Sequence, residues 1–198
     1  MRYALQRVND LYEFKIGNHM LHRFFTISLI FLFLTACSDE TTRLAPDGKP
    51  LPKLYDLRNQ DRATVQFRML DAINALRVSA GTKEVSLDSN LTAAAATHSR
   101  DMARQNRPWH FGSDGSSPLD RVERAKFRGV LVGEVISETY ETELETLSAW
   151  MNNKNTRRVI LDPKARQIGF SWFQEASGKI WWTLVLGMID LEIEMSKD

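Results

Sequence analysis

The hydrophobic and polar positions divide this chain into a short apolar segment, a polar stretch and a long region with clear periodicity. Between residues 63 and 80, apolar side chains recur every three or four positions, at Val65, Met69 and Ile73. This spacing predicts an amphipathic helix. A second helix is expected over residues 89–105, where small and apolar residues share one face.

The second half of the chain alternates between helical and strand-like patterns. We expect helices over residues 118–129, 139–152 and 156–161, and strands over residues 130–137, 168–172 and 180–186, with a brief extended piece at 84–87. A Ser177-Gly178 turn separates the last two strands, which predicts an antiparallel hairpin. This order of elements predicts an α+β fold, a three-layer α-β-α sandwich around a small antiparallel sheet.

The apolar segment runs from Phe24 to Leu34, and a bilayer-spanning helix needs about 20 residues. Its length and position are typical of the apolar region of an export signal. The signal has its own start at Met20, so residues 1–19 are expected to be an extra N-terminal extension. The Leu34-Thr35-Ala36-Cys37 sequence that follows resembles the lipobox of bacterial lipoproteins, which implies cleavage before Cys37 and lipid attachment to its sulfur.

Cys37 is the single cysteine of the 198 residues, which excludes an intramolecular disulfide and a multi-cysteine metal cluster. A chance apolar N-terminus with a buried thiol is the alternative interpretation of this segment. The lipobox interpretation divides the chain into a signal (1–36), a lipidated tether (37–62), a folded domain (63–187) and a C-terminal tail (188–198).

The expected location is the cell envelope, with attachment to the membrane through the acyl chains on Cys37. In a two-membrane envelope, Ser38 rather than Asp after the cysteine favours the outer membrane, facing the periplasm. The formal net charge of +1 gives no reason to expect a nucleic-acid partner.

Two residues are candidates for a functional site. His110 lies beside aromatics and a Gly/Asp/Ser turn, outside any periodic pattern, which indicates a site histidine; a loop anchor bonded to the backbone is the alternative. Glu134 is the one acid in an apolar run, so it needs a partner, the edge of a cleft or an outward-facing position. We expect these two side chains to face each other across a cleft. His98 lies on an apolar helix face and is expected to be a hydrogen-bonded core histidine.

From about Val65 to Gly187 the chain resembles the CAP superfamily (cysteine-rich secretory proteins, antigen 5, plant PR-1) in its bacterial SCP-domain form. The matching motifs are Asn74-x-x-Arg77, Ala95-x-x-His98-Ser99-x-x-Met102, the HFGSDGSS run at 110–117, Asp120-Arg121, Gly133-Glu134, Trp150-Met151-Asn152 and Ile168-Gly169. The resemblance implies an α-β-α sandwich with a cleft. In the family, two histidines and one or two acids often line this cleft and can bind a divalent metal such as zinc.

The chain departs from this family pattern at the cleft. His110 takes the first histidine position and Glu134 the acid of the Gly-Glu-Asn motif, whose Asn is replaced by Val135. The second histidine position falls on Thr156, and the second acid near Asn153. A catalytic zinc usually has three protein ligands, and two are present here, so we expect no metal and no other cofactor.

The chain is therefore expected to be a cell-envelope lipoprotein that is not an enzyme. It would bind a small ligand, a lipid or sterol, or a peptide at the four cleft positions His110, Glu134, Asn153 and Thr156. A hydrolase, either metal-assisted or dependent on the histidine–glutamate pair, is the alternative. A structural interaction protein of the envelope is a third possibility. It would use a surface around Trp172, Trp181 and Trp182, unless these belong to the core.

Overall fold

The computed structural model describes residues 55–139 and 141–189. The predicted signal, the lipidated Cys37 and most of the tether and tail lie outside the described residues. None of the helices within the described ranges combines the length and hydropathy that a membrane crossing requires.

A four-stranded sheet with the order β1-β3-β4-β2 forms the middle layer of the domain. Strand β4 (Ile180–Met188) pairs antiparallel with both β3 (Gln167–Gln174) and β2 (Val130–Thr139). Strand β1 (Ser86–Leu87) adds a two-residue parallel ladder to β3. The predicted α+β class and small antiparallel sheet are confirmed, with this short parallel strand at one edge.

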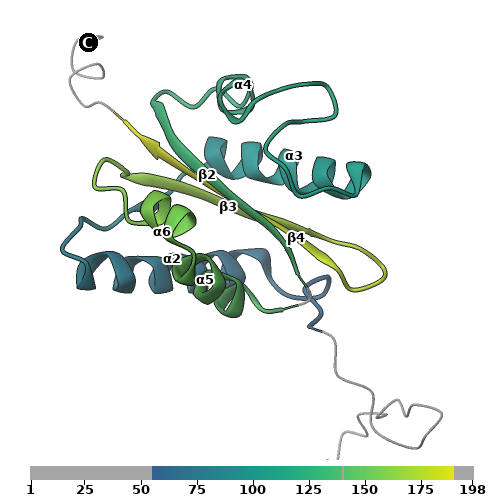
Figure 1. The fold of residues 1–198 in the computed structure, drawn as a ribbon, viewed down its shortest axis with the longest axis horizontal. Helices are drawn as coiled ribbons and strands as arrows, with labels where there is room; N and C mark the ends of the chain where they lie inside the picture. Colours follow the sequence, from purple (N-terminus) through teal and green to yellow (C-terminus); the bar gives the residue numbers. More distant parts are fainter. Residues whose placement is uncertain (1–54, 140, 190–198) are drawn as a thin grey trace, which may run out of the picture. The chain divides into compact units, whose positions relative to one another are not determined.

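Helices cover both faces of the sheet (Figure 1). Helices α3 (Ser89–Gln105) and α4 (Pro118–Arg124) lie on one face. Helices α2 (Arg62–Ser79), α5 (Glu143–Asn152) and α6 (Lys154–Ile160) lie on the other. The predicted three-layer arrangement is therefore present, and β2 forms one exposed edge of its middle layer.

Alternation along β4 divides the apolar side chains between two clusters. Trp182 and Leu184 pack in the larger cluster against α2 and α5, whereas Val185 packs against α3. Trp172, Trp181 and Trp182 are 4%, 0% and 0% exposed. The alternative in which these tryptophans form an interaction surface is therefore wrong, because all three are buried in the domain.

Side-chain caps fix where the helices begin. The carboxylates of Asp61 and Asp88 accept hydrogen bonds from main-chain N–H groups in the first turns of α2 and α3. The helix expected from residue 139 begins instead at residue 143, because β2 continues to Thr139 and Thr142 then forms a capping box with Glu145.

The first described residues already pack against the domain. Leu57 is 3% exposed, belongs to the larger core cluster and donates its N–H to Gln174 Oε1 at 2.8 Å. The Tyr55 hydroxyl donates to Glu143 Oε2 at 2.5 Å. Residues 55–62, which we assigned to the tether from their composition, thus contribute to the fold.

Candidate functional site

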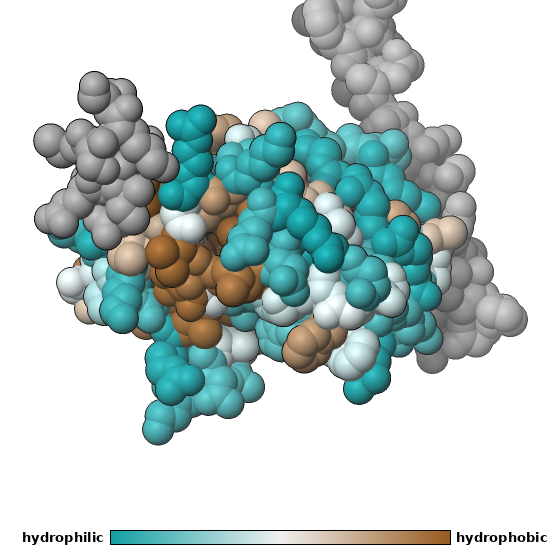
Figure 2. All heavy atoms as spheres, turned by 90° about the horizontal axis from the view of Figure 1, so that it is seen from above, coloured by the Kyte–Doolittle hydropathy of each residue, from teal (hydrophilic) through white to brown (hydrophobic). Residues whose placement is uncertain are grey.

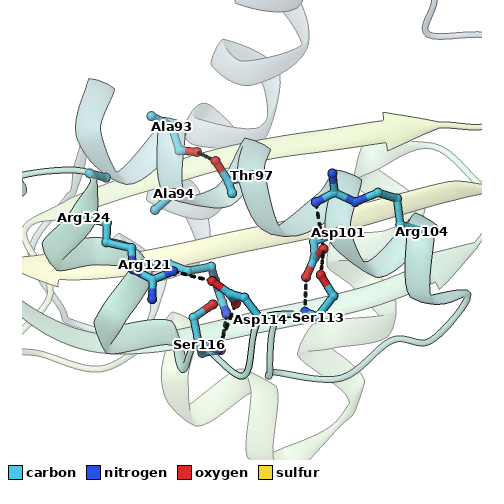
Figure 3. A pocket seen from close by; sticks show the side chains of 11 residues that line it. Ala93, Ala94, Thr97, Asp101, Arg104, Ser113, Asp114, Ser116, Arg121 and Arg124 are labelled. Atoms are coloured by element: carbon cyan, nitrogen blue, oxygen red, sulfur yellow. Dashed lines mark hydrogen bonds and ion pairs between the residues drawn. The ribbon is translucent and has the colours of Figure 1, made fainter.

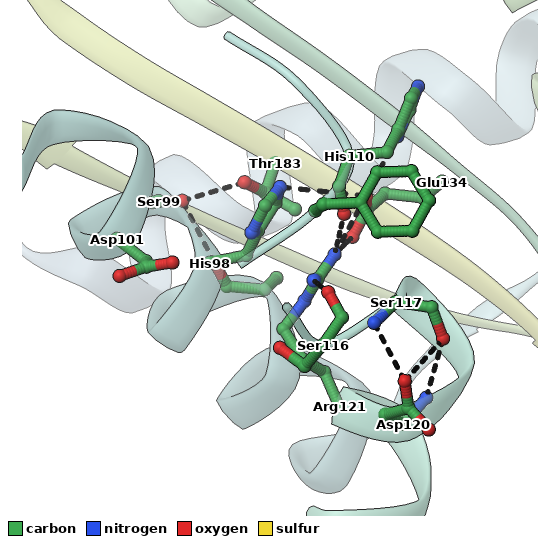
Figure 4. Close-up of polar contacts among 12 residues, drawn as sticks. His98, Ser99, Asp101, His110, Ser116, Ser117, Asp120, Arg121, Glu134 and Thr183 are labelled. Carbon is green, nitrogen blue, oxygen red and sulfur yellow. Dashed lines mark hydrogen bonds and ion pairs between the residues drawn. The ribbon is translucent and has the colours of Figure 1, made fainter. Parts of the chain in front are cut away.

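Four polar side chains converge between the sheet and the helices on the α3–α4 face (Figure 4). His98 comes from α3, Arg121 from α4 and Glu134 from β2. His110 comes from the loop that joins α3 to α4. These elements follow one another along the chain, and the cluster forms where they pack together on one face of the sheet.

Glu134 is the centre of this cluster. Its side chain is 2% exposed, and its Oε1 lies 2.9 Å from Nδ1 of His110. Nη2 of Arg121 lies 3.0 and 2.8 Å from Oε1 and Oε2. Both carboxylate oxygens therefore have charged or polar partners, which offsets the cost of burying the charge. The predicted need of Glu134 for a partner is met by two residues.

Opposing effects act on the pKa of the Glu134 carboxyl. Burial raises this pKa, whereas the hydrogen bond from His110 and the charge of Arg121 lower it. The lowering effects dominate, so the pKa lies below its ordinary value and Glu134 is ionised at neutral pH. A carboxylate with a low pKa and two occupied oxygens is poorly suited to act as a general base at neutral pH.

Arg121 connects Glu134 to the loop that carries His110. Its guanidinium is 5% exposed and donates to the main-chain oxygens of Ser116 and His110, both at 3.0 Å, as well as to Glu134. The sequence placed Arg121 within a family motif, but we did not predict that it belongs to the site. Besides that motif, its sequence signal was its position in a short, strongly capped helix after the loop.

His98 lies directly behind the Glu134 carboxylate. It is 0% exposed, and its Nε2 is 2.9 Å from the main-chain oxygen of Trp109. Because a carbonyl only accepts, Nε2 carries the hydrogen, and Nδ1 has no hydrogen-bond partner among the described residues. The predicted buried histidine with one partner is confirmed. However, its Nε2 also lies 3.7 Å from Glu134 Oε1, so it belongs to the same cluster.

His110 is the member of the cluster that solvent reaches, with 51% of its side chain exposed. Because Nδ1 donates to the carboxylate, Nε2 is the acceptor of the neutral ring. Its neighbours in the sequence are aromatic and contact each other: the Trp109 and Phe111 rings are 5.8 Å apart, and Arg107 stacks on Trp109 at 4.0 Å. Phe111 is 50% exposed. This loop offers a ligand one imidazole nitrogen beside an apolar and cationic surface.

The other two predicted cleft residues lie in the opposite helical layer. Asn153 accepts main-chain hydrogen bonds as the N-cap of α6, and the Thr156 hydroxyl donates to a main-chain oxygen of α5. Helix α6 packs through Val159 against Gly133, whose neighbour Glu134 points to the other face of β2. In the described structure, Asn153 and Thr156 thus have local partners only, and their role as cleft residues stays a prediction.

The donor set at the cleft does not fit a zinc ion. Within residues 55–139 and 141–189, no three His, Cys, Asp or Glu side chains are arranged to hold a metal. The two available donors are His110 and Glu134, and the carboxylate of Glu134 is bonded to Arg121. A cation at this carboxylate would lie beside the fixed positive charge of a guanidinium.

These features define the class of protein: an α-β-α sandwich with a histidine–glutamate pair at the edge of its sheet. The family model described as "Cysteine-rich secretory protein family" (CAP) matches residues 70–186. This chain belongs to the CAP family. The uncharacterized protein YkwD of Bacillus subtilis is 30% identical over 120 residues, which are 61% of this chain and 46% of YkwD. The chain therefore spans about half the length of this curated relative.

Solved structures show the same fold. An outer surface protein of Borrelia burgdorferi has a TM-score of 0.61 at 15% identity, over 66% of this chain and 97% of that one. An extracellular SCP-domain protein of Bacillus anthracis has a TM-score of 0.60 at 20% identity, over 74% and 44%. A cysteine-rich secretory protein of Staphylococcus aureus has a TM-score of 0.54 at 12% identity, over 72% and 44%.

Proposed function

We propose that this chain is a CAP-domain protein of the cell envelope that binds a ligand at His110 without catalysing its conversion and without a metal. The observation that carries this proposal is the state of Glu134. Its buried carboxylate is bonded to Arg121 through both oxygens and to His110 through one. The pair fixes the orientation of His110, and three of the roughly four acceptor sites of the carboxylate are already occupied, which disfavours a metal or a reacting proton there.

A peptide is the ligand that best matches the surface around His110. The neutral imidazole can accept a hydrogen bond from a peptide N–H, and the exposed ring of Phe111 can contact an apolar side chain. Arg107, stacked on Trp109, adds a positive charge to the same loop. A lipid or sterol would use the aromatic surface but not the hydrogen-bonding capacity of the ring.

Hydrolysis is the second candidate function, and one observation favours it. An exposed histidine that donates to a carboxylate is also the base–orienter arrangement of nucleophilic catalysis. Such a mechanism would need His110 Nε2 to activate a water molecule or a nucleophile brought by the substrate. The two candidates differ in one measurable outcome, the appearance of product.

Native mass spectrometry of the chain, after incubation with a short-peptide library or a lipid extract, tests the proposal. We expect a retained peptide of unchanged mass, and we expect its loss in His110→Ala. Phe67→Ala is a matched control, because Phe67 is 55% exposed on α2 in the opposite layer. Peptide cleavage or ester hydrolysis that disappears in His110→Ala would contradict the proposal and favour the hydrolase. A chain that stays empty with every ligand would also overturn it.

The envelope location rests on the sequence and on the relatives. The apolar segment from Phe24 to Leu34 followed by the Leu34–Cys37 motif supports export and lipid attachment at Cys37. Ser38 supports placement at an outer membrane over an inner one. Two similar solved proteins are described as extracellular and as an outer surface protein. The acyl chains would then present the ligand site at the membrane surface.

A further inference from the structure

A pocket of about 310 Å³ lies between α3, α4 and the loop that joins them (Figure 3). Neither His110 nor Glu134 belongs to its lining, so it is separate from the candidate cleft. Arg121 lines it and therefore connects the two sites. Ligand pockets in proteins typically have volumes of about 300–1,000 Å³, so this pocket suits a small molecule.

The pocket combines a small apolar wall with charges of both signs. Ala93, Ala94 and Ala125 contribute methyl groups from α3 and from the end of α4. Figure 2 shows that the face of the molecule seen from above, where α3 and α4 lie, is mostly hydrophilic with one local group of hydrophobic residues. A water-soluble ligand is therefore better matched to this side of the domain than an extended acyl chain.

Two ion pairs stand at the rim. Arg104 Nη2 lies 2.8 Å from Asp101 Oδ1, and Arg124 Nη1 lies 2.5 Å from Asp114 Oδ2. Hydrogen bonds from Ser116 and from Arg124 hold the pKa of Asp114 well below its ordinary value, so this carboxylate is ionised at neutral pH. Each arginine uses one guanidinium nitrogen in its pair, and the guanidinium carries five N–H donors. The rim can therefore receive a negative and a positive group together.

Arg121, which lines the pocket, holds a buried hydrogen-bond donor that is unmet. Its terminal nitrogens donate to Ser116, His110 and Glu134, but its buried Nε has no acceptor among the described residues. The side chain is 5% exposed. Buried donors are nearly always paired with a protein group, a water or a ligand. An acceptor from outside the chain would complete this guanidinium once it shifts toward the pocket, because Nε is buried in the described position.

We propose that the pocket binds a small zwitterionic amino acid or dipeptide. Its carboxylate would accept from the N–H groups of Arg124 outside the pair with Asp114, and from Nε of Arg121 once that guanidinium shifts toward the pocket, since guanidinium groups match the planar geometry of carboxylates. Its ammonium group would lie at Asp114, and its small side chain would contact the alanine methyl groups. The Gly112 turn holds the acidic part of the rim in place, because a Cβ there would lie 2.6 Å from Asp114 Oδ1.

Equilibrium dialysis of the full chain with labelled alanine and with labelled alanyl-alanine tests this proposal and distinguishes an amino acid from a dipeptide as the ligand. We expect saturable one-site binding of at least one of them, displaced by the unlabelled compound. Acetate and methylamine, which each carry one of the two charges, are expected to compete at least tenfold more weakly. No saturable binding at concentrations up to about 10 mM would overturn the proposal and leave a water as the acceptor of Nε.

Two pairs of variants locate the site. Ala93→Leu, at an exposed position of α3 on the rim, fills part of the pocket and should weaken binding at least tenfold, whereas Ala96→Leu on the same helix should not. Arg124→Gln should weaken binding similarly, whereas Arg128→Gln, an exposed arginine outside the lining, should not. Equal binding by all four variants, or acetate binding as tightly as alanine, would contradict the proposal. Circular dichroism melts establish that each variant is folded.

Discussion

At the scale of single residues, the site depends on one buried carboxylate and the guanidinium that neutralises it. Arg121 and Glu134 are 13 positions apart in the sequence, and the loop between α3 and α4 is bonded to the same guanidinium. Removing one partner of a buried ion pair leaves the other charge without compensation, which costs more than the pair contributes when intact. The site and the stability of the fold are therefore linked through Arg121.

Arg121→Ala should lower the free energy of unfolding by about 3–5 kcal/mol, because Glu134 would keep its burial and lose the charged partner whose Nη2 contacts both of its oxygens. Urea denaturation followed by circular dichroism measures this loss. Arg124→Ala is the matched control, since its pair with Asp114 is exposed and should contribute little. A loss in Arg121→Ala no larger than in the control would show that Glu134 is relaxed into solvent rather than buried.

His98 should make the stability of the domain depend on pH below neutrality. Burial lowers the pKa of His98 below the value of 6.5, although the carboxylates of Glu134 and Asp101 raise it and Arg121 lowers it. The contribution of His98 to the free energy of unfolding is complete at pH values above the pKa that this histidine has in the unfolded chain. It is lost as the pH falls from about 6.5 toward the lower pKa of His98 in the folded chain.

We therefore expect the free energy of unfolding to fall between pH 7 and pH 5, and to fall less in His98→Gln. The glutamine amide can still donate to the Trp109 oxygen but carries no titrating group. Urea unfolding curves at pH 7, 6 and 5 give the comparison. Parallel pH dependences of the wild type and the variant would show that His98 titrates alike in the folded and unfolded chain.

The sequence could predict that Glu134 needs a partner and that His110 faces it, because one acid in an apolar strand and a histidine in an aromatic loop are local signals. It could not predict Arg121 as the partner, because that contact arises only when α4 folds back over β2. His98 looked like an ordinary core residue, since its helix face is apolar and the carboxylate near it comes from another element.

At the scale of elements, two glycines let helices approach the sheet closely. A Cβ on Gly169 of β3 would lie 2.0 Å from the main-chain carbon of Leu91 in α3. A Cβ on Gly133 of β2 would lie 2.7 Å from a terminal methyl group of Val159 in α6. The main chain of α3 at Leu91 cannot move aside without shifting the whole helix, whereas the Val159 side chain can change rotamer.

Gly169→Ala should therefore destabilise the domain by more than the typical overpacking cost of about 1–3 kcal/mol, and Gly133→Ala by less. The second variant should be partly rescued by Val159→Ala, which removes the opposing methyl groups. A double-mutant cycle on thermal unfolding measures this coupling. Equal losses in the two single variants, or no coupling with Val159, would contradict the close approach of these elements.

The periodic pattern located every helix and the three long strands within residues 55–139 and 141–189, but it misplaced some boundaries because pairing overrides local preference. Strand β2 continues to Thr139, which pairs with Ile180 across the ladder, so the following helix starts at Glu143. The parallel pairing of residues 86–87 with residues 167–168 joins segments far apart in the chain. No local pattern in a two-residue strand indicates such a partner.

At the scale of the whole molecule, element order was enough to predict the three layers, because a sheet with apolar residues on both faces needs helices on both. Composition was a weaker guide to the domain boundary. Leu57 lies in a polar, proline-containing stretch, yet it is buried in the larger core cluster. Tyr55 is bonded to Glu143, and burial together with this contact raises its pKa to about 12, so it stays protonated as a donor.

The attachment of the chain to a membrane is predicted to depend on one atom, the sulfur of Cys37. Stable anchoring needs more than one acyl chain, and the apolar run from Phe24 to Leu34 is short of the roughly 20 residues that span a bilayer. Mass spectrometry of the N-terminal peptide from bacterial membranes should find a chain that begins at Cys37 and carries acyl groups. Cys37→Ser should lose this acyl mass and shift from the detergent phase to the aqueous phase, whereas Ser38→Ala should keep both. A wild-type chain with an unmodified Cys37 thiol would refute the anchor and leave ligand binding at His110 as a separate question.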